Sequence, residues 1–389
     1  MIPYGRQDIQ ESDIEAVEAV LRSDFLTQGP AVPMFERTVA HRSGAKFGVA
    51  CNSATSALHI ACLALKLVPG QRLWTVPNTF VASANCARYC GADVDFVDID
   101  PQTWNMSVPA LRDRLVRAKE NGTLPQIVVP VHFSGQPTDQ QAIWELAQEY
   151  GFRVVEDASH SIGATRDGER VGSCRWSDIT VFSFHPVKII TTAEGGMALT
   201  NDPELAQDMV MFRGHGVTRD PAKFRGESAG SGAWYYEQQI LGFNYRLTDI
   251  QAALGVSQLK RLEENVERRN RLAERYGSLL ADLPLRLPTV EAGNRSAFHL
   301  YVIRLQPEMA RRSRRRIFDE LRGSGIGVNV HYLPVHLQPY YRDLGFGPGW
   351  CPEAEAHGRE AITLPLHAAL TEADQDKVIA AVRQAILGA

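Results

Sequence analysis

The sequence predicts an α/β fold in which a mostly parallel sheet carries helices on both faces. From about residue 46 onward, short β-rich runs alternate with helical patterns, and this alternation is typical of parallel strands joined by crossover helices. Gly91 and Gly151 follow two of the helical patterns, where the end of a helix favours a positive φ. The 389 residues are enough for one large core and a second, smaller domain.

The expected elements can be given by residue range. Short runs rich in apolar and β-branched residues predict strands at 73–76, 94–97, 127–131, 153–156, 179–183 and 197–200. Apolar residues at helical spacing predict helices at 11–22, 55–67, 80–90, 108–120 and 138–150.

The second half of the chain predicts a smaller C-terminal α/β domain. A long helical pattern begins at Thr248, a good N-cap, and runs towards Leu283 with an expected break near Gly255. A strand at 298–305, an arginine-rich helix and a final helix capped at Thr371 follow. We place the boundary in this region and divide the chain into domains 1–255 and 256–389.

Composition argues against several classes of protein. A formal net charge of -4 gives no sign of a nucleic-acid partner. The six cysteines lack metal-binding spacing, so we expect no metal site and free thiols in a reducing compartment. The chain starts without the apolar run of a signal peptide, and its most apolar stretch, 49–68, carries Asn52, His59 and Lys66. That stretch predicts a buried helix, not a membrane span, and we expect a cytoplasmic protein.

Three predicted strand ends carry polar residues, at the sheet edge where open α/β proteins bind ligands. Residues 154–160, VVEDASH, end a strand on two carboxylates. Residues 52–58, NSATSAL, open a helix with hydroxyls and free N–H groups, which suits a phosphate. Residues 181–188, VFSFHPVK, end in a lysine. Neither Gly-x-Gly-x-x-Gly nor a P-loop occurs, so nothing supports a nicotinamide or nucleoside-triphosphate site.

Each of these residues has a structural explanation when taken singly. A lysine after a strand is usually solvated, and an aspartate or serine there usually caps a turn or a helix. Together, Lys188, Asp157 and the helix start at Thr55 supply what a pyridoxal phosphate site needs. These needs are an amine for covalent attachment, a carboxylate that keeps the pyridine nitrogen protonated, and a phosphate-binding helix N-terminus.

Longer segments resemble a known family. NSATSALH, VVEDASHSIG, FSFHPVKIITTAEGGM, RGHG, LGFNYRLTDIQAALG and VHYLPVHLQPYY are similar to the DegT/StrS-like sugar-nucleotide aminotransferases, across essentially the whole chain. The resemblance implies the fold type I of pyridoxal-phosphate-dependent transferases, with a seven-stranded sheet in the large domain, and a homodimer with shared active sites. IPYGRQDI, SDFLTQGPAVPMFE and HPVKIITTAEGG most resemble the branch that aminates the 4-keto sugar of the pseudaminic acid pathway.

The resemblance also implies roles for individual residues. Lys188 matches the lysine that holds the cofactor and moves a proton, and Asp157 matches the partner of the pyridinium nitrogen. His160 stands where many relatives carry glutamine, and we expect it at the ring oxygen or the ring face. The remaining residues implied at the cofactor are Ala54, Thr55, Ser56, Phe80, Ser183 and Asn244. Asn244 is expected to reach the cofactor of the neighbouring subunit, and Phe80 to stack on the ring, unless Phe80 is simply a core residue.

The implied substrates are L-glutamate as donor and a UDP-linked 2-acetamido-2,6-dideoxy-hexos-4-ulose as acceptor. The segments that resemble substrate-contacting regions contain Tyr4, Thr27, Gln28, Gly29, Pro30, His185, His331, Tyr332, Leu333 and Pro334. For any one of these residues, a plain loop role is equally open.

Other functions remain open to different degrees. An aminotransferase for another keto sugar, at the 3-keto position or linked to UDP, dTDP or GDP as in the bacillosamine or perosamine types, is separated poorly by sequence. The deoxysugar dehydratases of the same branch carry histidine in place of the lysine, so Lys188 argues against them. A non-catalytic regulatory protein would be credible if Lys188 or Asp157 were missing, and both are present.

Overall fold

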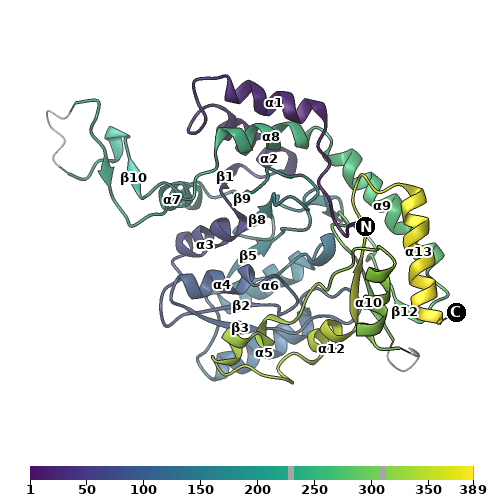
Figure 1. Cartoon of the computed structure of the whole chain (residues 1–389). Coiled ribbons are helices and arrows are strands. Elements are labelled where there is room, and N and C mark those ends of the chain that lie inside the picture. The colour runs from purple at the N-terminus through teal and green to yellow at the C-terminus, as the bar shows by residue number, and fades with distance from the viewer. Residues whose placement is uncertain (227–231, 307–311, 389) are drawn as a thin grey trace.

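Seven strands form the central sheet of the computed structural model, which describes residues 1–226, 232–306 and 312–388 (Figure 1). Their order is β1-β9-β8-β5-β4-β2-β3. The neighbouring pairs from β8 to β3 are parallel, whereas β9 runs antiparallel to both β8 and β1. The strands are β1 Phe47–Cys51, β2 Arg72–Thr75, β3 Asp93–Phe96, β4 Ile127–Val129, β5 Arg153–Asp157, β8 Ile179–Ser183 and β9 Gly196–Thr200. The mostly parallel sheet expected from the sequence is therefore confirmed, and β1 is an additional strand that was not predicted.

Helices cover this sheet and connect its strands. α3 packs beside both α4 and α7, α5 packs on α6, and α2 and α1 both pack on α8. Their bounds are α1 Glu11–Leu21, α2 Ala31–Ser43, α3 Ala54–Ala64, α4 Ala82–Tyr89, α5 Val108–Glu120, α6 Gln140–Tyr150, α7 Pro203–Arg213 and α8 Asp249–Leu259. Every residue of β8 and β9 is buried, as expected for strands in the middle of a covered sheet.

The predicted break near Gly255 is wrong. α8 continues through Gly255 to Leu259, and the chain turns at Lys260 and Arg261 before α9, Leu262–Leu279. Gly255 serves close packing: a Cβ atom there would lie 2.5 Å from a ring carbon of Phe35 in α2. The prediction that 49–68 is one buried helix is also wrong at its start, because β1 extends to Cys51 and α3 begins only at Ala54.

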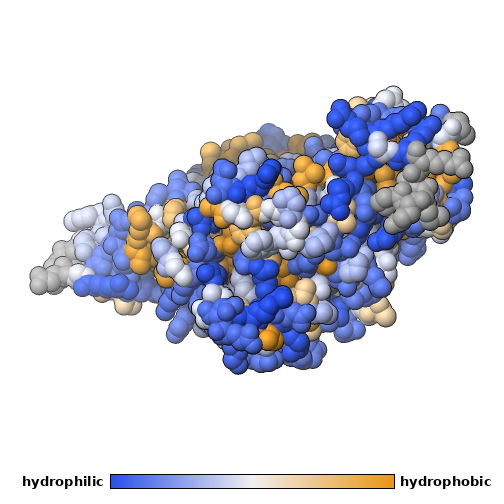
Figure 2. Space-filling model, turned by 90° about the horizontal axis from the view of Figure 1, so that it is seen from below, coloured by the Kyte–Doolittle hydropathy of each residue, from blue (hydrophilic) through white to orange (hydrophobic). Residues whose placement is uncertain are grey.

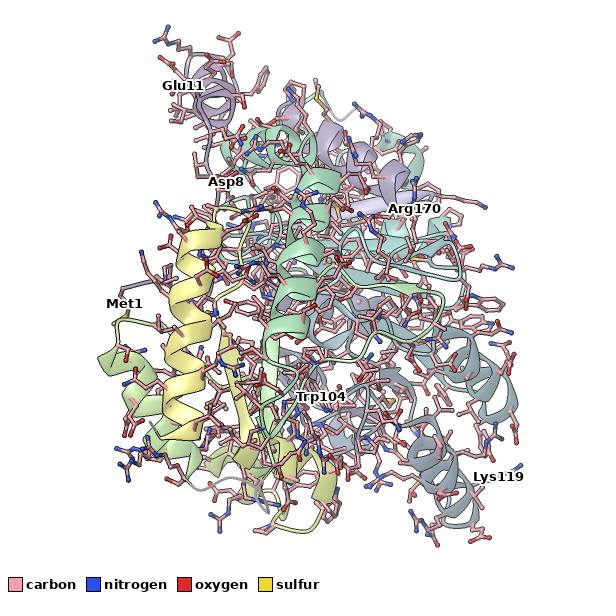
Figure 3. The ribbon with its side chains drawn as sticks, turned by 90° about the vertical axis from the view of Figure 1, so that its right-hand side faces the viewer. Met1, Asp8, Glu11, Trp104, Lys119 and Arg170 are labelled. Carbon is pink, nitrogen blue, oxygen red and sulfur yellow. The ribbon has the colours of Figure 1, made fainter. Side chains whose placement is uncertain are left out.

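The C-terminal part of the chain builds a second core around a small antiparallel sheet. β12 Leu285–Arg286, β14 Tyr301–Leu305 and β15 Ala361–Leu364 form that sheet. α9, α10 Arg314–Gly323 and α13 Glu372–Leu387 contribute buried residues to this core, and Figure 3 shows α9 and α13 side by side. Because α9 also contributes Leu262 to the core of the large sheet, the 255/256 boundary stays a prediction.

The N-terminal residues run along the C-terminal part before the chain enters α1. Ile2 pairs with Ile326, and the Leu366 N–H donates to the Tyr4 carbonyl at 3.0 Å. Figure 3 accordingly places Met1 near α10, at mid-height on the left, and Glu11 at the top. This path carries Tyr4 to the junction between the two parts of the structure.

A hairpin arm projects from the body on the side of α7 (Figure 1). Its strands are β10 Val217–Thr218 and β11 Glu237–Gln238. Trp234 and Leu241 on this arm are each 79% exposed, and Figure 2 shows hydrophobic residues where the arm leaves the body. The smaller elements elsewhere are β6 Thr165–Arg166, β7 Glu169–Arg170, β13 Asn294–Arg295, α11 Pro339–Arg342 and α12 Pro352–Glu360, with single 3-10 turns at Phe133–Gly135, Pro221–Lys223 and Val335–Leu337.

Three features bear on the expectations from composition. Within residues 1–226, 232–306 and 312–388, no helix combines the length and the apolar character that crossing a membrane requires. The same described residues contain no cluster of three side chains suited to a metal ion. All six cysteines are free thiols, and only Cys90 is not fully buried.

The substitution Gly255→Ala is expected to lower the free energy of unfolding by about 1–3 kcal/mol, because the new methyl group would overpack the α2–α8 contact. Gly277→Ala in α9 is the matched control. Its Cβ would meet nothing closer than the Tyr301 hydroxyl at 4.0 Å, so alanine should raise stability by about 0.5–1 kcal/mol. Urea denaturation of the purified variants measures both effects, and equal stability of Gly255→Ala and the parent would contradict this packing argument.

Candidate active site

A cavity of about 600 Å³ opens at the carboxyl ends of β5 and β8, where the two parts of the chain meet. Strand ends of the large sheet supply one wall of the cavity. Residues 329–332, which follow α10, supply the other wall. The sequence-predicted residues that line it are Tyr4, Ala54, Thr55, Phe80, Asp157, His160, Ser183, His185, Lys188, His331 and Tyr332. Residues far apart in the sequence are therefore brought together at the predicted edge of the sheet.

Lys188 lies in the turn that follows β8, and its backbone N–H donates to the His185 carbonyl at 2.9 Å. Burial lowers the pKa of its amine to about 8, while the negative charge of Asp157 acts in the opposite direction. A lysine with an ordinary pKa is almost wholly protonated near neutral pH and is a poor nucleophile. The cavity therefore gives Lys188 a larger fraction of neutral, reactive amine than a lysine in water has.

Asp157 is the last residue of β5, and its carboxylate is held by two donors. The Ser83 hydroxyl donates to Oδ2 at 2.6 Å, and the Ser159 N–H donates to Oδ1 at 3.1 Å. The Ser83 hydroxyl is also 2.7 Å from the Thr79 hydroxyl. Sequence reasoning missed Ser83, because no motif links a serine inside α4 to an aspartate 74 residues later.

The first turn of α3 provides unpaired N–H groups at the cavity. The Ser53 hydroxyl caps the helix by accepting from the Ser56 N–H at 3.1 Å, and the Ser56 hydroxyl donates to Asn52 Oδ1 at 2.7 Å. Ser56 is therefore engaged within the turn and lies outside the cavity lining. Gly196 permits this arrangement, since a Cβ there would lie 2.5 Å from the Ala54 nitrogen. Ala54 and Thr55 remain at the helix N-terminus, where an anion binds well.

Neutral histidines form another part of the lining. Burial and the charge of Lys188 lower the pKa of His160 and of His299 well below the ordinary value, and they lower that of His331 to about 3. The ring centroids of His160 and His299 are 4.5 Å apart, and His160 Nε2 is 3.3 Å from the Tyr332 hydroxyl. Sequence reasoning missed His299, since it lies within a strand-like run without any catalytic pattern.

Phe80 is 61% exposed at the mouth of the cavity, so the alternative interpretation of this residue as a core residue is wrong. It sits just before α4, beside the buried Thr79. An aromatic side chain exposed at a cavity can cover the face of a flat ligand at little conformational cost.

Several predicted site residues lie outside this cavity. Gln28 and Gly29 line a second cavity of about 670 Å³, together with Arg213, Tyr236 and Arg246. The predicted residues that line neither cavity are Ser56, Thr27, Pro30, Asn244, Leu333 and Pro334. Asn244 instead pairs with Gly214 at the base of the arm. Within one chain, the segments 27–30 and 244–246 therefore do not reach Lys188.

The profile of the DegT/DnrJ/EryC1/StrS aminotransferase family matches residues 7–383. The chain belongs to this family. GDP-perosamine synthase of Caulobacter vibrioides is 38% identical over 361 residues, which cover 92% of this chain and 91% of that protein. The UDP-4-amino-4,6-dideoxy-N-acetyl-beta-L-altrosamine transaminase of Campylobacter jejuni serotype O:23/36 is 35% identical over 368 residues, covering 94% and 93%.

A solved structure gives the same assignment. The sugar aminotransferase Spr1654 of Streptococcus pneumoniae, in its PMP form, superposes with a TM-score of 0.90 at 28% identity and covers 100% of both chains. The protein is thus a sugar aminotransferase of the DegT/DnrJ/EryC1/StrS family, and its cofactor is pyridoxal phosphate.

The cavity residues fit this cofactor on their chemistry. Lys188 offers a partly neutral amine, and Asp157 offers a carboxylate already fixed by two hydrogen bonds. The N-terminus of α3 and the hydroxyls of Thr55 and Ser183 suit the phosphate. Phe80 can cover the ring face.

The rate at which apoprotein takes up pyridoxal phosphate on Lys188 should rise with pH through a midpoint near pH 8, because only the neutral amine attacks. Asp157→Asn should move the midpoint of this rise to lower pH. The carboxylate of Asp157 raises the pKa of Lys188 in the parent protein, and the substitution removes that effect. Borohydride trapping followed by peptide mass measurement gives the rate at Lys188. Asp24→Asn, which removes an exposed carboxylate, is the control, and an upward shift in Asp157→Asn would refute the argument.

Proposed function

We propose that the protein transfers the amino group of L-glutamate to the C4 ketone of a UDP-linked 2-acetamido-2,6-dideoxy-hexos-4-ulose. The product is then UDP-4-amino-4,6-dideoxy-N-acetyl-β-L-altrosamine, a precursor for pseudaminic acid synthesis. The presence of Lys188 and Asp157 in one cavity is the observation that supports the amine-transfer chemistry. The 35% identity to the Campylobacter transaminase supports the choice of sugar.

In this proposal, five residues of the cavity bind the cofactor or move protons. Bound pyridoxal phosphate supplies an electron sink that stabilises negative charge on a carbon losing its proton. Lys188 would hold the cofactor, and its amine would remove the proton from the donor's Cα and return one at the cofactor's 4′ carbon. Asp157 keeps the ring nitrogen protonated, which maintains the sink. Ala54, Thr55 and Ser183 hold the phosphate.

One cavity must serve both halves of the reaction. The amine leaves glutamate first and reaches the keto sugar only after 2-oxoglutarate has departed, so we expect ping-pong kinetics. His160 and His331 lie beside Lys188 as neutral groups, which means that they do not add positive charge against the proton transfers. Tyr4, His185 and Tyr332 line the same space and are proposed to face the sugar.

We also propose that the active unit is a homodimer, working in the cytoplasm. The free thiols favour a reducing compartment. The exposed Trp234 and Leu241 on the arm suit burial against a second copy of the chain. Asn244 lies outside its own cavity, and in a dimer it would complete the phosphate site of the partner subunit.

A second acceptor is favoured by one specific observation. The 38% identity to GDP-perosamine synthase exceeds the 35% identity to the altrosamine transaminase, which supports a GDP-linked 4-keto sugar as the alternative. Both acceptors present a C4 ketone on a 6-deoxy hexose. The two proposals share the Lys188 chemistry and differ in the nucleotide and in the group at C2.

An amine-transfer assay with a panel of UDP-, dTDP- and GDP-linked keto sugars tests the acceptor. We expect the UDP-linked 2-acetamido sugar to give the highest kcat/KM, with the product stereochemistry assigned by NMR. Glutamate alone should change the visible absorbance of the holoenzyme, and this half-reaction should be lost in Lys188→Ala. A preference for the GDP-linked sugar would overturn the acceptor while leaving the half-reaction intact. Failure of the glutamate response would overturn the mechanism.

Hybrid dimers test the shared site. Lys188→Ala and Asn244→Asp chains should each be nearly inactive alone, and mixing them after partial denaturation and refolding should restore about a quarter of parental activity. Activity returns because each mixed dimer contains one site with both native residues. If Asn244 serves its own subunit, mixing restores nothing. Asn121→Asp, at the exposed C-cap of α5, is a control that should remain active alone.

A further inference from the structure

Three cysteines and a histidine gather where α3 meets α4, outside the lining of the cofactor cavity. Cys62 lies on α3 one turn after His59, and Cys86 and Cys90 lie one turn apart at the end of α4. The two helices pack side by side (Figure 1). Cys62 and Cys86 are fully buried, whereas Cys90 is only partly buried. The cluster therefore contains one thiol that solvent can reach and two thiols that solvent cannot reach.

The neighbours of Cys90 favour its thiolate. His59 is oriented by a 3.2 Å hydrogen bond between Nδ1 and the Tyr245 hydroxyl, and its ring lies 5.4 Å from that of Tyr89. The hydrogen bond with the Cys62 thiol lowers the pKa of Cys90 to about 6, and His59 adds to this effect while burial opposes it. A thiolate at neutral pH is the form that reacts with electrophiles and oxidants.

The surroundings of Cys86 and Cys62 indicate which of the two thiols would pair with Cys90. The Cys86 thiol donates to the Ser83 carbonyl at 3.2 Å and is thus turned back onto its own helix. Cys62 lies on the neighbouring helix α3, and the nearby thiols of Cys86 and Cys90 raise the pKa of Cys62. A protonated thiol beside a reactive thiolate is the arrangement of a resolving cysteine next to a redox-sensitive one.

We propose that Cys90 and Cys62 form a thiol–disulfide site that responds to peroxides. The Cys90 thiolate attacks one oxygen of hydrogen peroxide, the O–O bond breaks, and hydroxide leaves, so that Cys90 becomes a sulfenic acid. The Cys62 thiol then attacks the Cys90 sulfur, its proton goes to the departing hydroxyl, and water leaves. Two thiols are oxidised, one peroxide is reduced to two waters, and a single S–S bond joins α3 to α4.

The disulfide would act on the helix that begins at the cofactor cavity. Ala54 and Leu58 line that cavity, and Cys62 continues the same i, i+4 row along α3. His59 further connects the cluster to Tyr245, whose carbonyl accepts from the Asn52 N–H at 2.8 Å just before the helix. The modification site is therefore linked to the start of α3 through packed and hydrogen-bonded neighbours, and the proposal itself does not depend on which sugar is aminated.

Alkylation of the holoenzyme with iodoacetamide at pH 7 tests the first step without any variant. Cys90 should react at least about tenfold faster than Cys51 and Cys174, because burial raises the pKa of each of those thiols to about 12. Peptide mass spectrometry gives the rate for each cysteine. If Cys90 reacts no faster than Cys174, the proposal is wrong.

Hydrogen peroxide tests the second step. We expect a peptide pair linked through Cys62 and Cys90 and an intact mass lower by about 2 Da, restored by dithiothreitol. Cys62→Ser should instead leave Cys90 to oxidise further, raising the mass by about 32 Da for the sulfinic acid. The matched control Cys86→Ser should still form the link. Oxidation of Cys90 in the parent protein without a link to Cys62 would refute the pairing.

Discussion

The parallel pairing of β5 with β8 is the constraint on which the active site depends. Asp157 pairs with Val181 in this register, so the carboxylate at the end of one strand and the turn leading to Lys188 emerge at the same edge of the sheet. The side chains of both strands are buried almost throughout, so a one-residue slip of the register would move every side chain to the opposite face and disrupt the packing on both faces. Core packing thereby holds two catalytic groups at a set separation.

Electrostatic balance in the cavity follows from the same placement. Lys188 is the one lysine or arginine among the described residues that line the cavity, and burial moves its pKa towards neutrality. The histidines around it are kept neutral by burial and by the lysine itself. Asp157 supplies the opposing charge, and Ser83 fixes the direction in which that charge points. Reactivity at Lys188 is thus a property of the whole surrounding shell.

Periodicity and cap residues predicted most of the large domain. The strand at 179–183 was predicted with the bounds of β8, and Thr248 caps α8 as expected, by accepting from the Gln251 N–H. Errors arose where tertiary contacts override local pattern. Gly255 suggested a helix break, although close packing against Phe35 is the reason that a glycine stands there. β1 was missed because its short run adjoins a helix of the same apolar character.

Residue types and their local spacing already indicate the chemistry available to this protein: a lysine and an aspartate at strand ends, a hydroxyl-rich helix start, and family motifs along the whole chain. These are local features, and spacing and residue type are enough to recognise them. The tertiary structure decided which residues share a cavity with Lys188. It brought Ser83 and His299 to the site, kept Ser56 and Asn244 out of the cavity within one chain, and placed Cys62 near Cys90. Those outcomes depend on how helices and strands distant in sequence pack, and no local pattern encodes the distance between them.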